Sequence, residues 1–179
     1  NEDIRFFGNV NFGTDIKLED LKSFYDAVVF ATGARRDRDL ELPGIDLHGS
    51  FGAADFVYWY DGHPDAERTW DFQPHAKQVA VLGVGNVGLD VARIRAKTAD
   101  ELLVTEIPDN VYDGLKQNVT TDVHVFARRG PAQVKITPME LRELSHSPNI
   151  DVIVHPEGFE FDHGSMEALN AAKSQKLVV

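Results

Sequence analysis

The 179-residue sequence contains no cysteine. This absence excludes disulfide bonds, a C-x-x-C redox pair and a cysteine-ligated iron–sulfur cluster within these residues. Long apolar runs are also lacking: no stretch of about 18 apolar residues occurs, so no membrane-spanning helix is predicted. The first residues do not show the basic and then apolar order of a secretory signal, and we therefore expect a cytoplasmic protein.

Positive charge is scarce as well. The sequence has 29 acidic and 18 basic residues, a formal net charge of −11. Such a surface would repel phosphate polyanions, which argues against general nucleic-acid binding. The seven histidines never occur at a ligand spacing such as H-x-x-x-H, so no metal site is predicted. What the sequence does have is 42% hydrophobic residues, which predicts a packed core.

Short apolar segments alternate with segments of helical character. The expected strands are residues 4–10, 25–31, 78–82, 122–127 and 150–154. The expected helices are residues 18–24, 51–59, 86–97, 108–117 and a segment that begins at 137. This alternation predicts a parallel α/β sheet. The polar segment 60–76, which contains two prolines, is expected to be a linker.

The most informative pattern is a G-x-G-x-x-G formed by Gly83, Gly85 and Gly88. It follows an expected strand and opens an expected helix, which is the context of a dinucleotide-binding turn. The first glycine permits a tight reversal, the second lets the backbone approach a diphosphate, and the third lets the helix pack closely. The helix N-terminus would then face the anion. The alternative is a purely structural strand–turn–helix.

Two arginines, Arg128 and Arg129, end the strand expected at 122–127. NAD-binding domains place a carboxylate at the end of the second strand. Guanidinium groups instead bind the 2′-phosphate of NADP(H), so the pair predicts that cofactor. A solvated basic pair is the alternative. The pair lies about 40 residues after the turn rather than about 20, and the helix expected at 108–117 accounts for the difference.

Glu140 has two interpretations. With Thr137 it matches a capping box, in which both side chains satisfy backbone donors at a helix start. It could also reach the ribose of a nicotinamide. The sequence slightly favours the capping box.

The motifs together resemble the adrenodoxin-reductase class of flavin-dependent ferredoxin–NADP reductases. The segments that carry the resemblance are Leu82–Arg93, Arg128–Gln133 and Glu140–Glu143, with support from Tyr25–Gly33 and Phe56–Gly62. In that family an NADP domain interrupts an FAD domain. The resemblance therefore implies an α/β fold with a Rossmann-like doubly wound parallel sheet, preceded by part of an FAD domain.

The same resemblance implies a domain organisation. Residues 1–45 would be the tail of the first FAD-domain segment, 46–76 a crossover and linker, and 77–179 an NADP(H)-binding domain truncated at its C-terminus. The glycine motif that holds FAD in this family is not in the sequence. We therefore expect a piece of a longer protein that does not retain flavin by itself and is inactive alone.

By position, the resemblance assigns NADP(H) contacts to the turn and to three later side chains. The turn residues are Gly83, Val84, Gly85, Asn86, Val87 and Gly88. Their backbone and the Asn86 side chain would contact the pyrophosphate. Arg128 and Arg129 would hold the 2′-phosphate, and Glu140 would approach the nicotinamide. Family members often have glutamine where this sequence has Val84, so a side-chain bond is lost there.

Asp90 and Glu143 match acidic residues near the flavin–nicotinamide junction of the family, which makes them candidate catalytic residues. Each also has a structural interpretation. Asp90 can pair with Arg93 on one helix face, and Glu143 can be a solvated helix residue.

The resemblance implies hydride transfer between NADPH and FAD, with electrons passed to a ferredoxin-type iron–sulfur protein. A glutamate-synthase-like reductase is one alternative, but these typically carry Gly-Asn-Thr-Ala-Met-Asp where this sequence has Gly85–Asp90. A non-catalytic NADP(H)-sensing module is another, although such a module needs no flavin-domain strand like the one ending in Ala31–Gly33. Arg93, Arg95 and Arg142 could give an acidic ferredoxin a local basic face.

Overall fold

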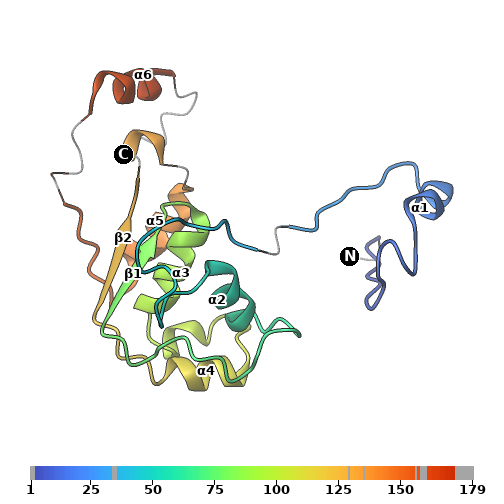
Figure 1. Cartoon of the computed structure of the whole chain (residues 1–179), viewed down its shortest axis with the longest axis horizontal. Helices are drawn as coiled ribbons and strands as arrows, with labels where there is room; N and C mark the ends of the chain where they lie inside the picture. The colour runs from blue at the N-terminus through green and yellow to red at the C-terminus, as the bar shows by residue number, and fades with distance from the viewer. Residues whose placement is uncertain are drawn as a thin grey trace. The chain divides into compact units, whose positions relative to one another are not determined.

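The computed structural model describes residues 3–33, 36–128, 130–134, 136–155, 157 and 161–171. The chain divides into two compact units, residues 1–35 and 36–179 (Figure 1). In chain order the helices, strands and 3₁₀ turns are α1 (Leu18–Phe24), α2 (Ala53–Tyr60), β1 (Gln78–Leu82), α3 (Asn86–Ala96), η1 (Asp100–Leu102), α4 (Asp109–Leu115), β2 (Asp122–Phe126), η2 (Pro131–Gln133), α5 (Pro138–His146) and α6 (His163–Ala171). None of the described helices is both long and apolar enough to cross a bilayer.

The first unit contains α1, as the sequence predicts. The Lys17 backbone N–H donates to Asp20 Oδ2 at 2.9 Å, which satisfies a donor at the helix start. The strands expected at 4–10 and 25–31 are wrong: neither segment forms a strand. Most of their apolar side chains are exposed, with Phe6 at 92%. A strand exists only through hydrogen bonds to a neighbour, and no described strand pairs with these segments.

The second unit is built around β1 and β2, which pair in parallel from Gln78↔Asp122 to Leu82↔Phe126. Helix α3 packs against both strands (Figure 1). Val81 is consequently buried, whereas Leu82 and Phe126 remain about half exposed. The strand expected at 150–154 is wrong, because these described residues form no strand and pair with neither β1 nor β2.

The core lies between α2, α3, η1 and α4. Its buried members are Phe56, Trp59, Phe72, Ile94, Ala99, Leu102, Val111 and Leu115. The segment 60–76 has no helix or strand beyond the last residue of α2, as expected of a linker, but it is not a free one. Phe72 is only 5% exposed, and its ring centroid lies 4.5 Å from that of Trp59. Burial of this aromatic side chain fixes the segment against the helices.

Arg95 also holds this segment. It is 3% exposed, and it donates to the carbonyl oxygens of Phe72 and Gln73 and to Thr120 Oγ1. Burial lowers the pKa of Arg95 to about 10. A buried charge is tolerated when its donors find acceptors, so these three oxygens account for its position.

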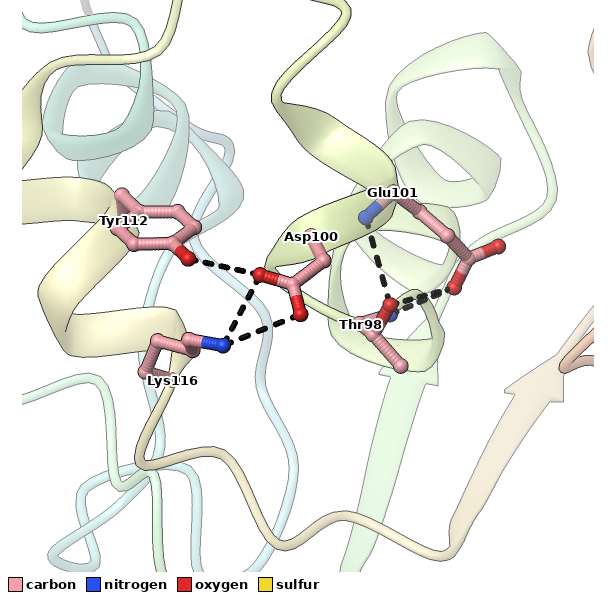
Figure 2. A network of polar contacts seen from close by, with 5 residues as sticks. All are labelled: Thr98, Asp100, Glu101, Tyr112 and Lys116. Carbon is pink, nitrogen blue, oxygen red and sulfur yellow. Dashed lines mark hydrogen bonds and ion pairs between the residues drawn. The ribbon is translucent and has the colours of Figure 1, made fainter.

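Two polar clusters fix the connection between α3 and α4 (Figure 2). Asp100 accepts hydrogen bonds from Tyr112 Oη at 2.7 Å and Lys116 Nζ at 2.9 Å. Beside it, Thr98 and Glu101 form a reciprocal cap: the Thr98 N–H donates to Glu101 Oε2 at 2.9 Å, and the Glu101 N–H donates to Thr98 Oγ1 at 3.4 Å. This pattern satisfies donors at the start of η1.

Candidate functional site

The three glycines of the motif lie between β1 and α3, and each has the surroundings that its expected role requires. Gly83 has φ +127°, a conformation that L side chains rarely adopt. No heavy atom lies within 4 Å of the position that a Cβ would take at Gly85. A Cβ at Gly88 would collide with the Gly83 carbonyl oxygen, so only glycine permits this close approach.

The turn presents the beginning of α3 beside the end of β2. Asn86 and Val87, the first residues of α3, are exposed. The first amides of a helix have no intrahelical partner and lie at the positive end of its dipole. The Gly83 N–H donates to the Phe126 carbonyl at 2.8 Å, which brings the turn beside the carboxyl end of β2. The arrangement can therefore bind an anionic group at the ends of two parallel strands.

Arg128 is exposed and lies two residues beyond the end of β2. The structure thus places one of the two predicted 2′-phosphate ligands at the strand end that the turn adjoins. The prediction for Arg129 falls outside the described residues.

Asn86 joins the turn to the start of α5. Its Oδ1 accepts a hydrogen bond from the Thr137 N–H at 2.9 Å. The expected capping box of Thr137 and Glu140 is therefore wrong: Thr137 is the N-cap, but its side chain makes no capping hydrogen bond. The donor that Glu140 would have satisfied is taken by Asn86, which leaves the half-buried Glu140 carboxylate available for another contact.

The two candidate catalytic carboxylates belong to one polar network. Asp90 contacts Arg93 within α3, and Arg93 Nη1 lies 3.4 Å from Glu143 Oε2 on α5. Tyr60, the last residue of α2, donates its hydroxyl to Asp90 Oδ2. The structural interpretation of Asp90 as the partner of Arg93 is thus confirmed, and Glu143 is not merely solvated. The spacing of Asp90 and Arg93 is visible in the sequence, but no local pattern predicts the contact of Asp90 with Tyr60, 30 residues away.

Burial and charge shape the protonation of this network. Burial, and then the hydrogen bond to Asp90, raise the pKa of Tyr60, so its hydroxyl stays protonated. Burial lowers the pKa of Arg93, but the contact with Asp90 and the charges of Glu143 and Glu140 outweigh it, so the net shift is upward. Burial and the charge of Asp90 raise the pKa of Asp61. Arg93 is therefore a permanent cation among carboxylates.

The basic face considered for an acidic ferredoxin does not form as expected. Arg95 is buried, and Arg93 is engaged by Asp90 and Glu143. Of the three arginines, Arg142 alone is exposed. Its single charge makes no basic surface on these helices.

The chain matches known proteins along most of its length. Residues 9–131 match the pyridine nucleotide-disulphide oxidoreductase family. The chain is 44% identical to the NADPH-ferredoxin reductase FprA of Mycobacterium leprae, over 87% of this chain and 34% of that protein. It is 35% identical to the mitochondrial NADPH:adrenodoxin oxidoreductase of Arabidopsis thaliana, over 99% of this chain and 37% of that protein.

Solved structures of proteins from the same class also match this chain. The structure of Mycobacterium tuberculosis FprA in complex with NADPH matches with a TM-score of 0.80 and 37% identity, over 97% of this chain and 38% of that chain. The chain belongs to the pyridine nucleotide-disulphide oxidoreductase family and has its α/β Rossmann-like fold. Within that family it falls in the class of FprA and the adrenodoxin reductases, so the resemblance seen in the sequence is confirmed. It spans about a third of the length of these relatives.

Proposed function

We propose that the chain is the NADP(H)-binding part of an FAD-dependent ferredoxin–NADP reductase. The observation that carries this proposal is the glycine turn between β1 and α3, with an open approach at Gly85 and a close helix–strand contact at Gly88. The likeness to FprA, whose structure holds NADPH, supports the same assignment. We assign residues 1–45 to the FAD domain, 46–76 to the crossover and 77–179 to the NADP(H) domain.

The described residues fit NADP(H). The pyrophosphate would bind the backbone of Gly83–Gly88, where a side chain at Gly85 would block its approach. Because Asn86 Oδ1 accepts from Thr137, its Nδ2 remains to donate to a phosphate oxygen. Arg128 and Arg129 would bind the 2′-phosphate, and Glu140 would lie toward the nicotinamide.

When bound, NADPH would supply a hydride and FAD would accept it and pass electrons to a ferredoxin-type iron–sulfur protein. The contribution of this chain is binding and orientation, since the cofactors carry the redox chemistry. The turn anchors the pyrophosphate, and Asp90 and Glu143 act at the nicotinamide end. We further propose a cytoplasmic location for the whole protein.

Calorimetric titration with NADP⁺ and NAD⁺ tests the proposal. We expect a clear preference for NADP⁺, because two guanidinium groups bind the 2′-phosphate. The double variant Arg128→Ala, Arg129→Ala should weaken NADP⁺ binding by about tenfold or more and leave NAD⁺ binding unchanged. Equal affinity for the two dinucleotides, or no binding by a folded chain, would contradict the assignment.

A further inference from the structure

Arg93 lies between two carboxylates that belong to different helices. Its guanidinium contacts Asp90 within α3 and approaches Glu143 on α5 at 3.4 Å. The Arg93 side chain is 19% exposed, compared with 47% for that of Glu143. A guanidinium carries five N–H donors in one plane, so it can hold two carboxylates at once. Within the described part of the chain, Arg93 Nε is the one buried side-chain nitrogen or oxygen without a hydrogen-bond partner.

A third helix joins the same network. Tyr60 donates its hydroxyl from the end of α2 to Asp90 Oδ2, so Asp90 is held by a donor from α2 and by a cation from its own helix. The chain of contacts from Tyr60 through Asp90 and Arg93 to Glu143 therefore connects α2, α3 and α5. Tyr60 and Asp90 join α2 to α3 directly, and the Arg93 guanidinium extends the network from α3 to α5.

The network lies on the face of α3 that begins at the glycine turn. Asn86, Asp90 and Arg93 follow the spacing i, i+4, i+7, which places them on one side of the helix. Asn86 binds the start of α5 through Thr137, and Arg93 contacts the same helix about two turns further along α3. The two contacts therefore fix α3 against α5 at two points about two turns apart. Asp90 on α3 lies between the two α3 residues that make these contacts.

We infer that Arg93 is a positioning residue of the proposed reductase, which holds the carboxylates of Asp90 and Glu143 in one arrangement at the nicotinamide end of the site. The inference rests on the proposed function, because a nicotinamide bound through the turn is what these carboxylates would meet. With Arg93 present, the two carboxylates share one positive charge. Without it they repel each other, and Glu143, already half exposed, turns toward solvent.

The experiment uses the full-length flavoprotein and measures, without oxygen, the single-turnover rate at which NADPH reduces the bound flavin. In Arg93→Gln we expect this rate to fall about tenfold or more, because small displacements of orienting groups are costly. The dissociation constant of NADPH should change by less than about threefold, because the pyrophosphate and 2′-phosphate contacts remain. Arg93→Lys should recover part of the rate, since it keeps the cation but can hold only one carboxylate well.

A double-variant comparison separates positioning from a general loss of stability. If Arg93 acts by holding Glu143, then Arg93→Gln should slow the reaction much less when Glu143→Gln is already present. The exposed Glu143 side chain makes its variant compatible with folding, so Glu143→Gln alone, expected to be slow, tests the network even if Arg93→Gln does not fold. Arg38→Gln, which removes a charge from an exposed loop, is the matched control and should react at the wild-type rate.

Each possible result of these measurements either supports or overturns the inference about Arg93. An Arg93→Gln enzyme with the wild-type rate, a rate and an NADPH affinity that fall in proportion, or an Arg93→Lys enzyme no faster than Arg93→Gln would overturn the inference. The same holds for additive effects of Arg93→Gln and Glu143→Gln, or for Glu143→Gln at the wild-type rate. A wild-type enzyme whose flavin NADPH does not reduce would instead overturn the proposed function, and the inference with it.

Discussion

Gly85 and Gly88 have opposite surroundings although they belong to one motif. The space at Gly85 is open, and its φ of −137° is one that any residue adopts. At Gly88 the Gly83 carbonyl oxygen occupies the space that a side chain would need. Gly85 thus leaves room for a ligand, whereas Gly88 lets helix and strand approach each other.

This difference predicts two distinct results for alanine substitution. Gly88→Ala should lower the free energy of unfolding by about 1–3 kcal/mol, because a methyl group forces the backbone at Gly83 to move. Gly85→Ala should leave stability unchanged and abolish NADP⁺ binding, because its methyl group occupies the path of the diphosphate. Denaturant unfolding and calorimetry measure both. A Gly88→Ala protein as stable as the wild type would show that the turn accepts a side chain there, contrary to this expectation.

The partners of Asn86 and Arg93 show how much of the site lies outside the glycine motif. The role of Asn86 in binding Thr137 and the contact of Arg93 with Glu143 span 51 and 50 residues of sequence. The sequence predicts Asn86 as a pyrophosphate contact, and it predicts the Asp90–Arg93 pair from the spacing of the two residues. The partners of Asn86 and Arg93 on α5 could not be predicted, because the contact depends on how two helices pack.

Among the elements, the unit β1–turn–α3 and the helices α2, α4 and α5 were predicted within a few residues of their observed bounds. The local signals were sufficient there: an apolar strand, a glycine turn, a proline before α4. The strands expected at 4–10, 25–31 and 150–154 failed because an apolar run shows only that a segment needs burial. Whether it becomes a strand depends on a neighbour to pair with.

The connection between η1 and α5 predicts a dependence of stability on pH. Glu101 Oε1 accepts from Ser147 Oγ, at the end of α5, at 2.6 Å. Burial alone would raise the pKa of Glu101, but the hydrogen bonds from Ser147 and Thr98 lower it to about 2. Because the folded-state pKa lies below the ordinary value of 4.5, this carboxylate stabilises the fold above pH 4.5, and the contribution is lost as the pH falls toward 2.

Glu101→Gln should therefore cost about 1–2 kcal/mol at neutral pH, less than the full pKa shift implies because water screens a partly exposed carboxylate. Between pH 5 and about 2, the wild-type stability should fall more steeply than that of the variant. Urea unfolding at a series of pH values measures this. Glu106→Gln, at an exposed glutamate, is the control. Parallel stability curves for the wild type and Glu101→Gln would refute the role of the cap.

In the molecule as a whole, the first unit exposes many of its apolar side chains, including Phe6 at 92% and Val29 at 85%. We propose that these side chains contact other parts of the FAD domain to which we assign the segment. Arg93 is engaged by two carboxylates and Arg95 is buried, so neither contributes to an exposed basic surface. For the proposed iron–sulfur partner, a basic surface would have to come from residues other than these two arginines.

This organisation predicts where flavin is retained. The 179-residue chain, purified alone, should bind NADP⁺ but be colourless, because it holds only part of the proposed FAD domain. The full-length protein should be yellow, and NADPH should bleach its flavin absorption under anaerobic conditions. Absorption spectra of the two proteins decide this. Stoichiometric flavin in the 179-residue chain would contradict the division of the domains, and a colourless full-length protein would contradict the reductase assignment.

The sequence by itself determined the class of protein and the glycine turn, and it predicts a phosphorylated dinucleotide, because each depends on residues adjacent along the chain or at fixed spacing. The tertiary structure decided which side chains work together. It paired the Thr137 amide with Asn86 rather than Glu140, buried Arg95 against a segment that looked like a free linker, and joined Tyr60, Asp90, Arg93 and Glu143. Such contacts arise from the packing of distant segments, which no local pattern specifies.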